Sequence, residues 1–218
     1  MAAITQRIKI DIISDTVCPW CFIGKRRLDR AMEQIKTTNP NAEFQIEWHP
    51  YQLDPALSKE PITKLEMYRR RFGEVRARQM VPAMKKLGLE EGIRFAYDGV
   101  IANTLDSHRL VYWAKQFGKQ NEMVEEMFTF YFEQDKCLTD YEALAEAAAH
   151  VGLDKTKALE YLKSDKDVDA VRTAVFESQR NSVHGVPNFT IQNKYNLSGA
   201  QDPETLVEVF EEILKDSK

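Results

Sequence analysis

The sequence predicts an α/β fold into which an all-helical domain is inserted. Three observations lead to this prediction: a strand–helix–strand pattern near the N-terminus, a strand–strand–helix pattern near the C-terminus, and helical periodicity through most of the chain between them. The stretch between them, residues 55–183, is far too long to be a loop. Residues 1–54 and 184–218 are therefore expected to meet in space as one discontinuous domain.

The first unit begins with apolar residues that alternate with polar ones between Arg7 and Ser14, a pattern typical of a half-buried strand. A helix with one apolar face follows and is expected to end near Asn39. A second alternating run, Glu43–Leu53, predicts a second strand. This order and spacing indicate a βαβ unit, in which the strands are parallel and the connection is right-handed.

The inserted block is expected to open with a proline-containing loop, Asp54–Pro61. Two helices should follow, Lys64–Gly73 and Glu74–Leu87, and Pro82 should kink or break the second because it lacks a backbone N–H. The next segment, Gly88–Tyr97, shows only a short alternation of apolar residues. Its assignment to a strand is left open.

Asn103 is the expected N-cap of a series of amphipathic helices that continues to Val175. After these helices the hydrophobic period changes from 3.6 back to 2 residues, as in a strand. The runs Phe189–Ile191 and Tyr195–Leu197 predict a β-hairpin. The sequence Asp202-Pro203-Glu204 combines an N-cap, a first-turn proline and a first-turn acid, which predicts that the final helix begins there.

A Cys-x-x-Cys pair, Cys18 and Cys21, lies at the turn between the first strand and the first helix. Two cysteines at this spacing in one helical turn can form a disulfide with little backbone movement. Cys18 should lie at the helix N-terminus, where free backbone N–H groups and the helix dipole stabilise an anion. Pro19 suits the first helical position, and Trp20 is expected to shape access to the Cys18 sulfur.

Two other interpretations of this pair remain open from the residues alone. One is a zinc site, although zinc takes four ligands and the sequence has no second Cys pair and no His-x3-His spacing. The other is an inert pair, which would not need the strand–turn–proline–helix setting. The third cysteine, Cys137, has no partner in the pattern and is expected to be a bystander. No metal site is predicted.

The run Asp15–Leu28 resembles the active-site segment of the DsbA-like thioredoxin superfamily, and most of all that of its FrnE-type branch. This resemblance implies a thioredoxin-like fold with an inserted helical domain, the arrangement that the periodicity also indicates. Further matches follow in the family's order and span most of the chain: Trp48–Leu53, Asn103-Thr104 with His108-Arg109-Leu110, Gly185–Phe189 and Ser198–Gln201.

The resemblance also implies a cis peptide bond between Val186 and Pro187, with the proline packed against the cysteine pair. From the residues alone a trans bond stays the default, because only about 5% of X-Pro bonds are cis. A cis proline would leave the Val186 backbone free to pair with an extended substrate. Asn103 and His108 are expected beside the same cleft as substrate-binding residues. Asp15 either orients a water, takes part in proton transfer to the second cysteine, or merely ends a strand.

These features predict an enzyme, a thiol–disulfide oxidoreductase that acts on disulfide- or thiol-containing proteins or small molecules through Cys18 and Cys21. No metal or organic cofactor is required, and glutathione is a candidate co-substrate. One alternative is a glutathione-dependent transferase or isomerase, like the related kappa-class glutathione transferases and 2-hydroxychromene-2-carboxylate isomerases. Those relatives typically carry serine at the first cysteine position. The second alternative is a non-catalytic redox sensor or client-binding protein.

Composition and charge limit the classes of binding partner and the cellular compartments that the sequence predicts. A formal charge of −4 argues against nucleic-acid binding, and no apolar run approaches the ~20 residues of a membrane span. Polar residues interrupt the run Ile4–Ile13, so no secretory signal is expected and the cytoplasm is the default location. A homodimer remains open. A basic cluster follows the motif and forms either a solvated helix face or a site for an anionic partner such as glutathione: Lys25, Arg26, Arg27 and Arg30.

Overall fold

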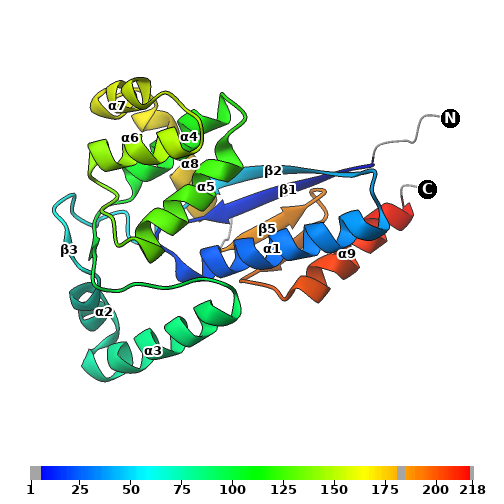
Figure 1. Ribbon diagram of the computed structural model, residues 1–218, viewed down its shortest axis with the longest axis horizontal. Coiled ribbons are helices and arrows are strands. Elements are labelled where there is room, and N and C mark those ends of the chain that lie inside the picture. The colour runs from blue at the N-terminus through cyan, green and yellow to red at the C-terminus, as the bar shows by residue number, and fades with distance from the viewer. Residues whose placement is uncertain (1–5, 181–184, 217–218) are drawn as a thin grey trace.

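A four-stranded mixed sheet forms the centre of the computed structural model, which describes residues 6–180 and 185–216 (Figure 1). The strand order is β2-β1-β5-β6, with β1 and β2 parallel and the other two pairings antiparallel. The predicted βαβ and ββα units are therefore confirmed, and β1 joins them. The strands are β1 (Gln6–Ser14), β2 (Ala42–Pro50), β5 (Asn188–Ile191) and β6 (Tyr195–Ser198).

Two helices cover one face of this sheet. Figure 1 shows α1 (Pro19–Thr38) and α9 (Pro203–Asp216) lying side by side across it. The alternating isoleucines of β1 explain this arrangement, because Ile8, Ile10 and Ile12 are all fully buried in the core. Burial of each such side chain stabilises the fold by about 1.5–3 kcal/mol. The face predicted from sequence is thus the face that holds α1 in place.

The helical insertion lies between β2 and β5, which confirms the predicted fold class. In Figure 1 helices α4 to α8 gather beyond the N-terminal end of α1, while α2 and α3 lie on its other side. The beginning of α1 is thereby flanked by both groups. The helices are α2 (Lys64–Phe72), α3 (Glu74–Glu90), α4 (Leu105–Lys115), α5 (Gln120–Phe128), the π-helical η1 (Thr129–Glu133), α6 (Tyr141–His150), α7 (Lys155–Lys163) and α8 (Val168–Arg180).

Two details near the site differ from the sequence-based expectations. The second strand ends at Pro50 rather than Leu53, because the Leu53 N–H donates to the Asp15 carboxylate at 2.8 Å instead of extending the sheet. Helix α4 is capped at Thr104 rather than Asn103, although the Asn103 side chain still accepts a hydrogen bond from a backbone N–H of the first turn.

The first part of the insertion also departs from the expected pattern. Helix α3 continues through Pro82, so the predicted break is absent, and residues on either side of the proline pack against the core. Helix α3 extends to Glu90, and the following residues up to Tyr97 form no strand. A small two-stranded sheet, β3 (Ile62–Thr63) with β4 (Val100–Ile101), was not anticipated, since neither strand is long enough to show a period.

The expected domain boundary at residue 184 lies outside the described residues, and the domain limits stay a prediction. Within the described part of the chain, no helix combines the length and the hydropathy that a membrane crossing requires.

Candidate active site

The cysteine motif occupies the turn between β1 and α1. Cys18 is the N-cap of α1 with an extended backbone (φ −91°, ψ 112°), and Pro19 is the first helical residue, as the sequence predicted. The Cys18 N–H donates to the Asp15 carbonyl at 3.1 Å, and the Cys18 carbonyl accepts from the Cys21 N–H at 3.0 Å. These two hydrogen bonds fix the turn that presents the first cysteine.

The two cysteines are free thiols with different surroundings. Cys18 is 4% exposed and lines a cavity, and its thiol lies 3.5 Å from the Val186 carbonyl oxygen, to which it donates. Cys21 is fully buried. Burial raises the pKa of the Cys21 thiol well above its ordinary value, and the neighbouring Cys18 raises it further. Cys21 is therefore a protonated thiol at neutral pH, and Cys18 is the accessible member of the pair.

The Val186–Pro187 peptide bond is cis, as the resemblance implied, and β5 begins with the next residue. Because β5 pairs with β1, the loop before β5 lies beside the turn after β1. Gly24 of α1 makes the close approach possible: a Cβ at this position would lie 2.9 Å from Cγ of Pro187 and 3.2 Å from Cζ of Phe189. Gly24 was not among the site residues predicted from the sequence, although a lone glycine inside a helical segment is a signal of such a close approach.

Asp15 and His108 form a buried pair behind the cysteines. One carboxylate oxygen of Asp15 accepts from the Leu53 N–H at 2.8 Å, and the other lies 3.2 Å from Nε2 of His108. Asp15 also lines the cavity, so it is not a solvated strand end. The hydroxyls of Thr16 and Ser107 meet nearby at 2.9 Å. Helix α4 is thus docked onto the active-site turn through polar side chains.

Asn103 uses its side chain inside the protein. Its amide nitrogen donates to the Pro55 and Leu57 carbonyls, and its oxygen accepts from the Leu105 N–H and from Gln52. All four hydrogen-bonding positions of the amide are occupied. Asn103 does not line the cavity, and its assignment as a substrate contact stays a prediction.

A cavity of about 850 Å³ opens in front of Cys18. The cysteine turn and the loop at Gly185-Val186 form one side, and the 45%-exposed Trp20 belongs to the same lining. The opposite side comes from the helical insertion. Its apolar residues include Leu57, Ile62, Met67, Phe72, Met80, Val81, Met84 and Ile101. This second wall could not be predicted from the sequence, because helical periodicity indicates apolar faces but not which of them remain uncovered.

Two tyrosines of this wall, Tyr68 and Tyr97, lie with ring centroids 5.7 Å apart. Burial raises the pKa of Tyr68 to about 12, and the nearby Cys18 sulfur adds to the effect. Burial likewise raises the pKa of Tyr97 above its usual range. Both phenols are therefore neutral hydrogen-bond donors at physiological pH. The Tyr97 hydroxyl is buried and makes no hydrogen bond of ordinary length within the described residues, although the neighbouring Tyr68 hydroxyl contributes to raising its pKa.

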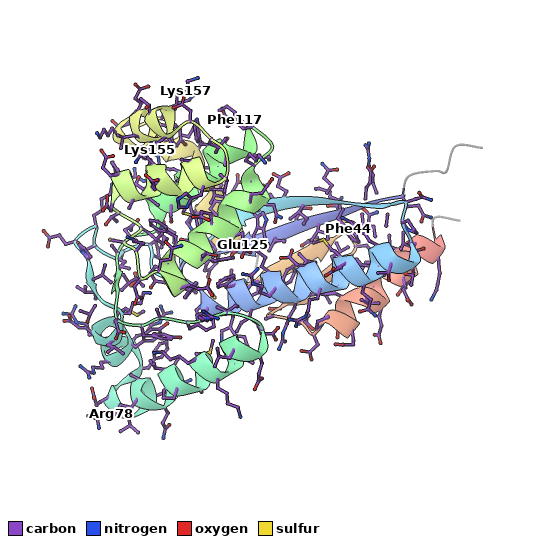
Figure 2. All side chains as sticks on the ribbon, viewed as in Figure 1. Phe44, Arg78, Phe117, Glu125, Lys155 and Lys157 are labelled. Atoms are coloured by element: carbon purple, nitrogen blue, oxygen red, sulfur yellow. The ribbon has the colours of Figure 1, made fainter. Side chains whose placement is uncertain are left out.

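The basic cluster after the motif is paired internally. Lys25 and Arg26 both contact Glu125, at 3.0 and 2.6 Å, and this glutamate is labelled on α5 in Figure 2. Arg27 and Arg30 share Glu91 in the same way, at 2.7 and 2.5 Å. Each of these cations therefore has a carboxylate partner within the chain, and the cluster ties α1 to its neighbours.

Among residues 6–180 and 185–216, no group of three or more His, Cys, Asp or Glu side chains is arranged to hold a metal ion.

Comparison with known proteins identifies the family. The model of the DSBA-like thioredoxin domain matches residues 9–211. The chain belongs to this family. YwbO of Bacillus subtilis is 25% identical over 212 residues, which cover 97% of this chain and 98% of that protein. A probable DsbA oxidoreductase of Streptomyces coelicolor has a similar structure, with a TM-score of 0.85, 25% identity, and coverage of 95% of this chain and 90% of that one.

A 2-hydroxychromene-2-carboxylate isomerase shares the fold of this family member at a TM-score of 0.69, with 13% identity and coverage of 96% and 97% of the two chains. At that identity the likeness concerns the fold alone.

Proposed function

We propose that the protein is a thiol–disulfide oxidoreductase with Cys18 as the nucleophile and Cys21 as the resolving cysteine. One observation carries the proposal: Cys18 caps α1 at the floor of a cavity, facing the Val186 carbonyl, while Cys21 is fully buried one helical turn further on. A substrate in the cavity can reach the first sulfur and not the second. Membership of the DsbA-like family supports the same chemistry.

The reaction proceeds by two exchanges. The Cys18 thiolate attacks one sulfur of the substrate disulfide, the substrate S–S bond breaks, and the departing thiolate takes a proton from water. The Cys21 thiolate then attacks the Cys18 sulfur and releases the second substrate thiol, which leaves a Cys18–Cys21 disulfide. Two electrons have passed to the substrate. The reverse sequence oxidises a dithiol.

The Cys21 proton must leave before the second exchange. We assign its acceptance to Asp15, which is buried beside the motif and held by the Leu53 N–H and by His108. No metal or organic cofactor enters this scheme. Glutathione is the proposed reductant that regenerates the dithiol, and the cytoplasm, a reducing compartment, is the proposed location.

Two single variants test the scheme with hydroxyethyl disulfide as the substrate. Cys18→Ser should abolish exchange, whereas Cys21→Ser should accumulate a mixed disulfide on Cys18 that mass spectrometry detects on the intact protein. Cys137→Ser serves as the control and should behave as the wild type. A stable adduct on Cys21 in the Cys18→Ser variant would reverse the two roles. Conjugation of glutathione to an electrophile without any disulfide exchange would point to transferase chemistry instead.

A further inference from the structure

The cavity in front of Cys18 is larger than a disulfide group requires. Its volume of about 850 Å³ falls within the roughly 300–1,000 Å³ of small-molecule sites. Met67 on α2 and Met80 and Met84 on α3 contribute unbranched, polarizable side chains to its wall. Methionine adapts to the shape of an apolar ligand. The wall opposite the cysteine is therefore suited to an apolar body attached to the reacting sulfur.

The same wall holds a polar group that the protein leaves unused. Tyr97 is 4% exposed, and its hydroxyl makes no hydrogen bond of ordinary length in the described part of the chain, although the Tyr68 hydroxyl lies near enough to contribute to its raised pKa. A buried hydroxyl without a partner destabilises a fold, so an acceptor supplied by a ligand would stabilise the complex. The Tyr97 hydroxyl therefore favours a ligand that carries a carbonyl, nitro or carboxylate oxygen as a hydrogen-bond acceptor.

Two carboxylates and two guanidinium groups line the cavity, and they differ in the partners they have within the chain. Asp54 is held by the Ala56 N–H, which donates to its carboxylate at 3.1 Å. Arg70 pairs with Glu66 at 2.5 Å, and the carboxylate of Asp15 is held by hydrogen bonds. Arg71 forms no ion pair with any carboxylate of residues 6–180 and 185–216, and its guanidinium lies 5.7 Å from the ring centroid of Phe72. A guanidinium binds carboxylates strongly through paired hydrogen bonds. Arg71 therefore favours an anionic ligand group.

Helix α2 is fixed in place before any ligand arrives. Its first residue, Lys64, is buried and donates to the Tyr131 carbonyl at 2.6 Å, to Asp135 at 2.6 Å and to the Ala96 carbonyl at 3.3 Å. These hydrogen bonds hold Met67, Tyr68 and Arg71 opposite the cysteines. The wall therefore loses little conformational entropy when a ligand binds.

We propose that this cavity selects a small organic disulfide whose apolar or aromatic arm carries an anionic group. The arm lies on the methionine wall, the anionic group binds Arg71, and an acceptor oxygen binds the Tyr97 hydroxyl. The inference rests on the proposed function and names the substrate class of the same site. In the exchange the Cys18 sulfur bonds to one sulfur of this ligand, the ligand S–S bond breaks, and the other arm leaves as a thiolate.

Single-turnover exchange with pre-reduced protein tests the proposal without a regenerating reductant. All proteins carry Cys137→Ser, so that the signal comes from the active-site pair. The probes are dithiobis-nitrobenzoate (aromatic and anionic), dithiodipyridine (aromatic and neutral) and hydroxyethyl disulfide (small and neutral). Arg71→Ala should lower the rate constant for the anionic probe about 10-fold and leave those for the two neutral probes within about twofold. The effect should shrink in high salt.

Arg78→Ala is the matched control. Arg78 is an exposed arginine on α3, and Figure 2 shows it pointing away from the rest of the molecule. Its removal should change no rate constant, since Arg78 does not line the cavity. Tyr97→Phe should slow the nitrobenzoate exchange roughly 3- to 10-fold without lowering thermal stability, because the lost hydroxyl makes no hydrogen bond of ordinary length among the described residues. A purely structural tyrosine would instead lower stability and slow all three probes.

The outcomes separate the two proposals. Equal slowing of all three probes by Arg71→Ala, or slowing of none, would overturn the substrate class while leaving disulfide exchange in place. A disulfide-linked peptide that reacts faster than every probe would also overturn it. Failure of the wild-type protein to react with hydroxyethyl disulfide would refute the proposed function itself.

Discussion

Gly24→Ala is expected to displace the cis-proline loop from α1. The added Cβ would lie 2.9 Å from Cγ of Pro187, 3.2 Å from Cζ of Phe189 and 3.6 Å from Cα of Ala200. Carbon atoms in favourable contact are about 3.5–4.0 Å apart. The proline ring must therefore move by at least about 0.6 Å, and the Val186 carbonyl, which accepts from the Cys18 thiol, moves with it.

Two opposing contributions set the size of the effect on stability. Alanine is favoured over glycine inside a helix by about 1 kcal/mol. Overpacking of a well-packed site costs about 1–3 kcal/mol. The free energy of unfolding should therefore fall by about 0–2 kcal/mol, as measured by urea denaturation. The rate of exchange with hydroxyethyl disulfide should fall more steeply, by roughly 10- to 100-fold, because small displacements of reacting groups are costly.

Alkylation of Cys18 by iodoacetamide provides the control. Its rate should stay near the wild-type value, because the first turn of α1 is untouched by the substitution at Gly24. A variant that is about 1 kcal/mol more stable than wild type and exchanges disulfides at the full rate would refute the reasoning, since Pro187 would then not press against α1.

Three further predictions follow from burial and charge. In the Asp15→Asn variant, release of the second thiol should accelerate about tenfold per pH unit between roughly pH 7 and 9 in stopped-flow traces, because burial keeps the pKa of Cys21 high and the assigned proton acceptor is gone; an equal slope in the wild type would contradict the role of Asp15. Cys137→Ala should keep activity within a few-fold, since the only hydrogen-bond partner of this half-buried thiol among the described residues is the Thr139 hydroxyl. Burial would raise the pKa of Glu91, yet hydrogen bonds from Arg27 and Arg30 hold it below its ordinary 4.5; the contribution of Glu91 is then complete above about pH 4.5 and is lost as the pH falls through the folded-state value. Glu91→Gln should therefore lower stability at pH 7 by about 1–3 kcal/mol and flatten the acid side of a pH–stability curve.

The elements that sequence alone predicted are those whose signals are local. β1 alternates and α1 carries an apolar stripe because each element packs its apolar face against the other. Either pattern therefore indicates that a second element covers it. Pro19 fixed the start of the helix and hence the position of Cys18 as its cap. The final helix was marked in the same way by Asp202 and Pro203.

The rest of the site depends on contacts between distant segments. Asp15 and His108 are 93 residues apart and only the folded chain brings them within 3.2 Å. The pairing of Ile62 with Ile101 closes a two-residue sheet, too short for any period to appear. The free hydroxyl of Tyr97 became visible only once its neighbours were known. A hydrophobic period of 3.6 residues in a helix, or of 2 residues in a strand, indicates which face of the element is apolar. It does not indicate which other element packs against that face.

The site also has an order of assembly imposed by synthesis. The Cys18 sulfur and the Val186 carbonyl are 168 residues apart along the chain. At roughly 5–20 residues per second, the cysteine motif is made roughly 8–30 seconds before the strand that completes its sheet. During that interval β1 has only β2 as a neighbour in the sheet, and the Cys18 thiol lacks the Val186 carbonyl to which it later donates. A nascent chain stopped before residue 185 would therefore be an unshielded dithiol, open to oxidants and proteases, and not a partly active enzyme.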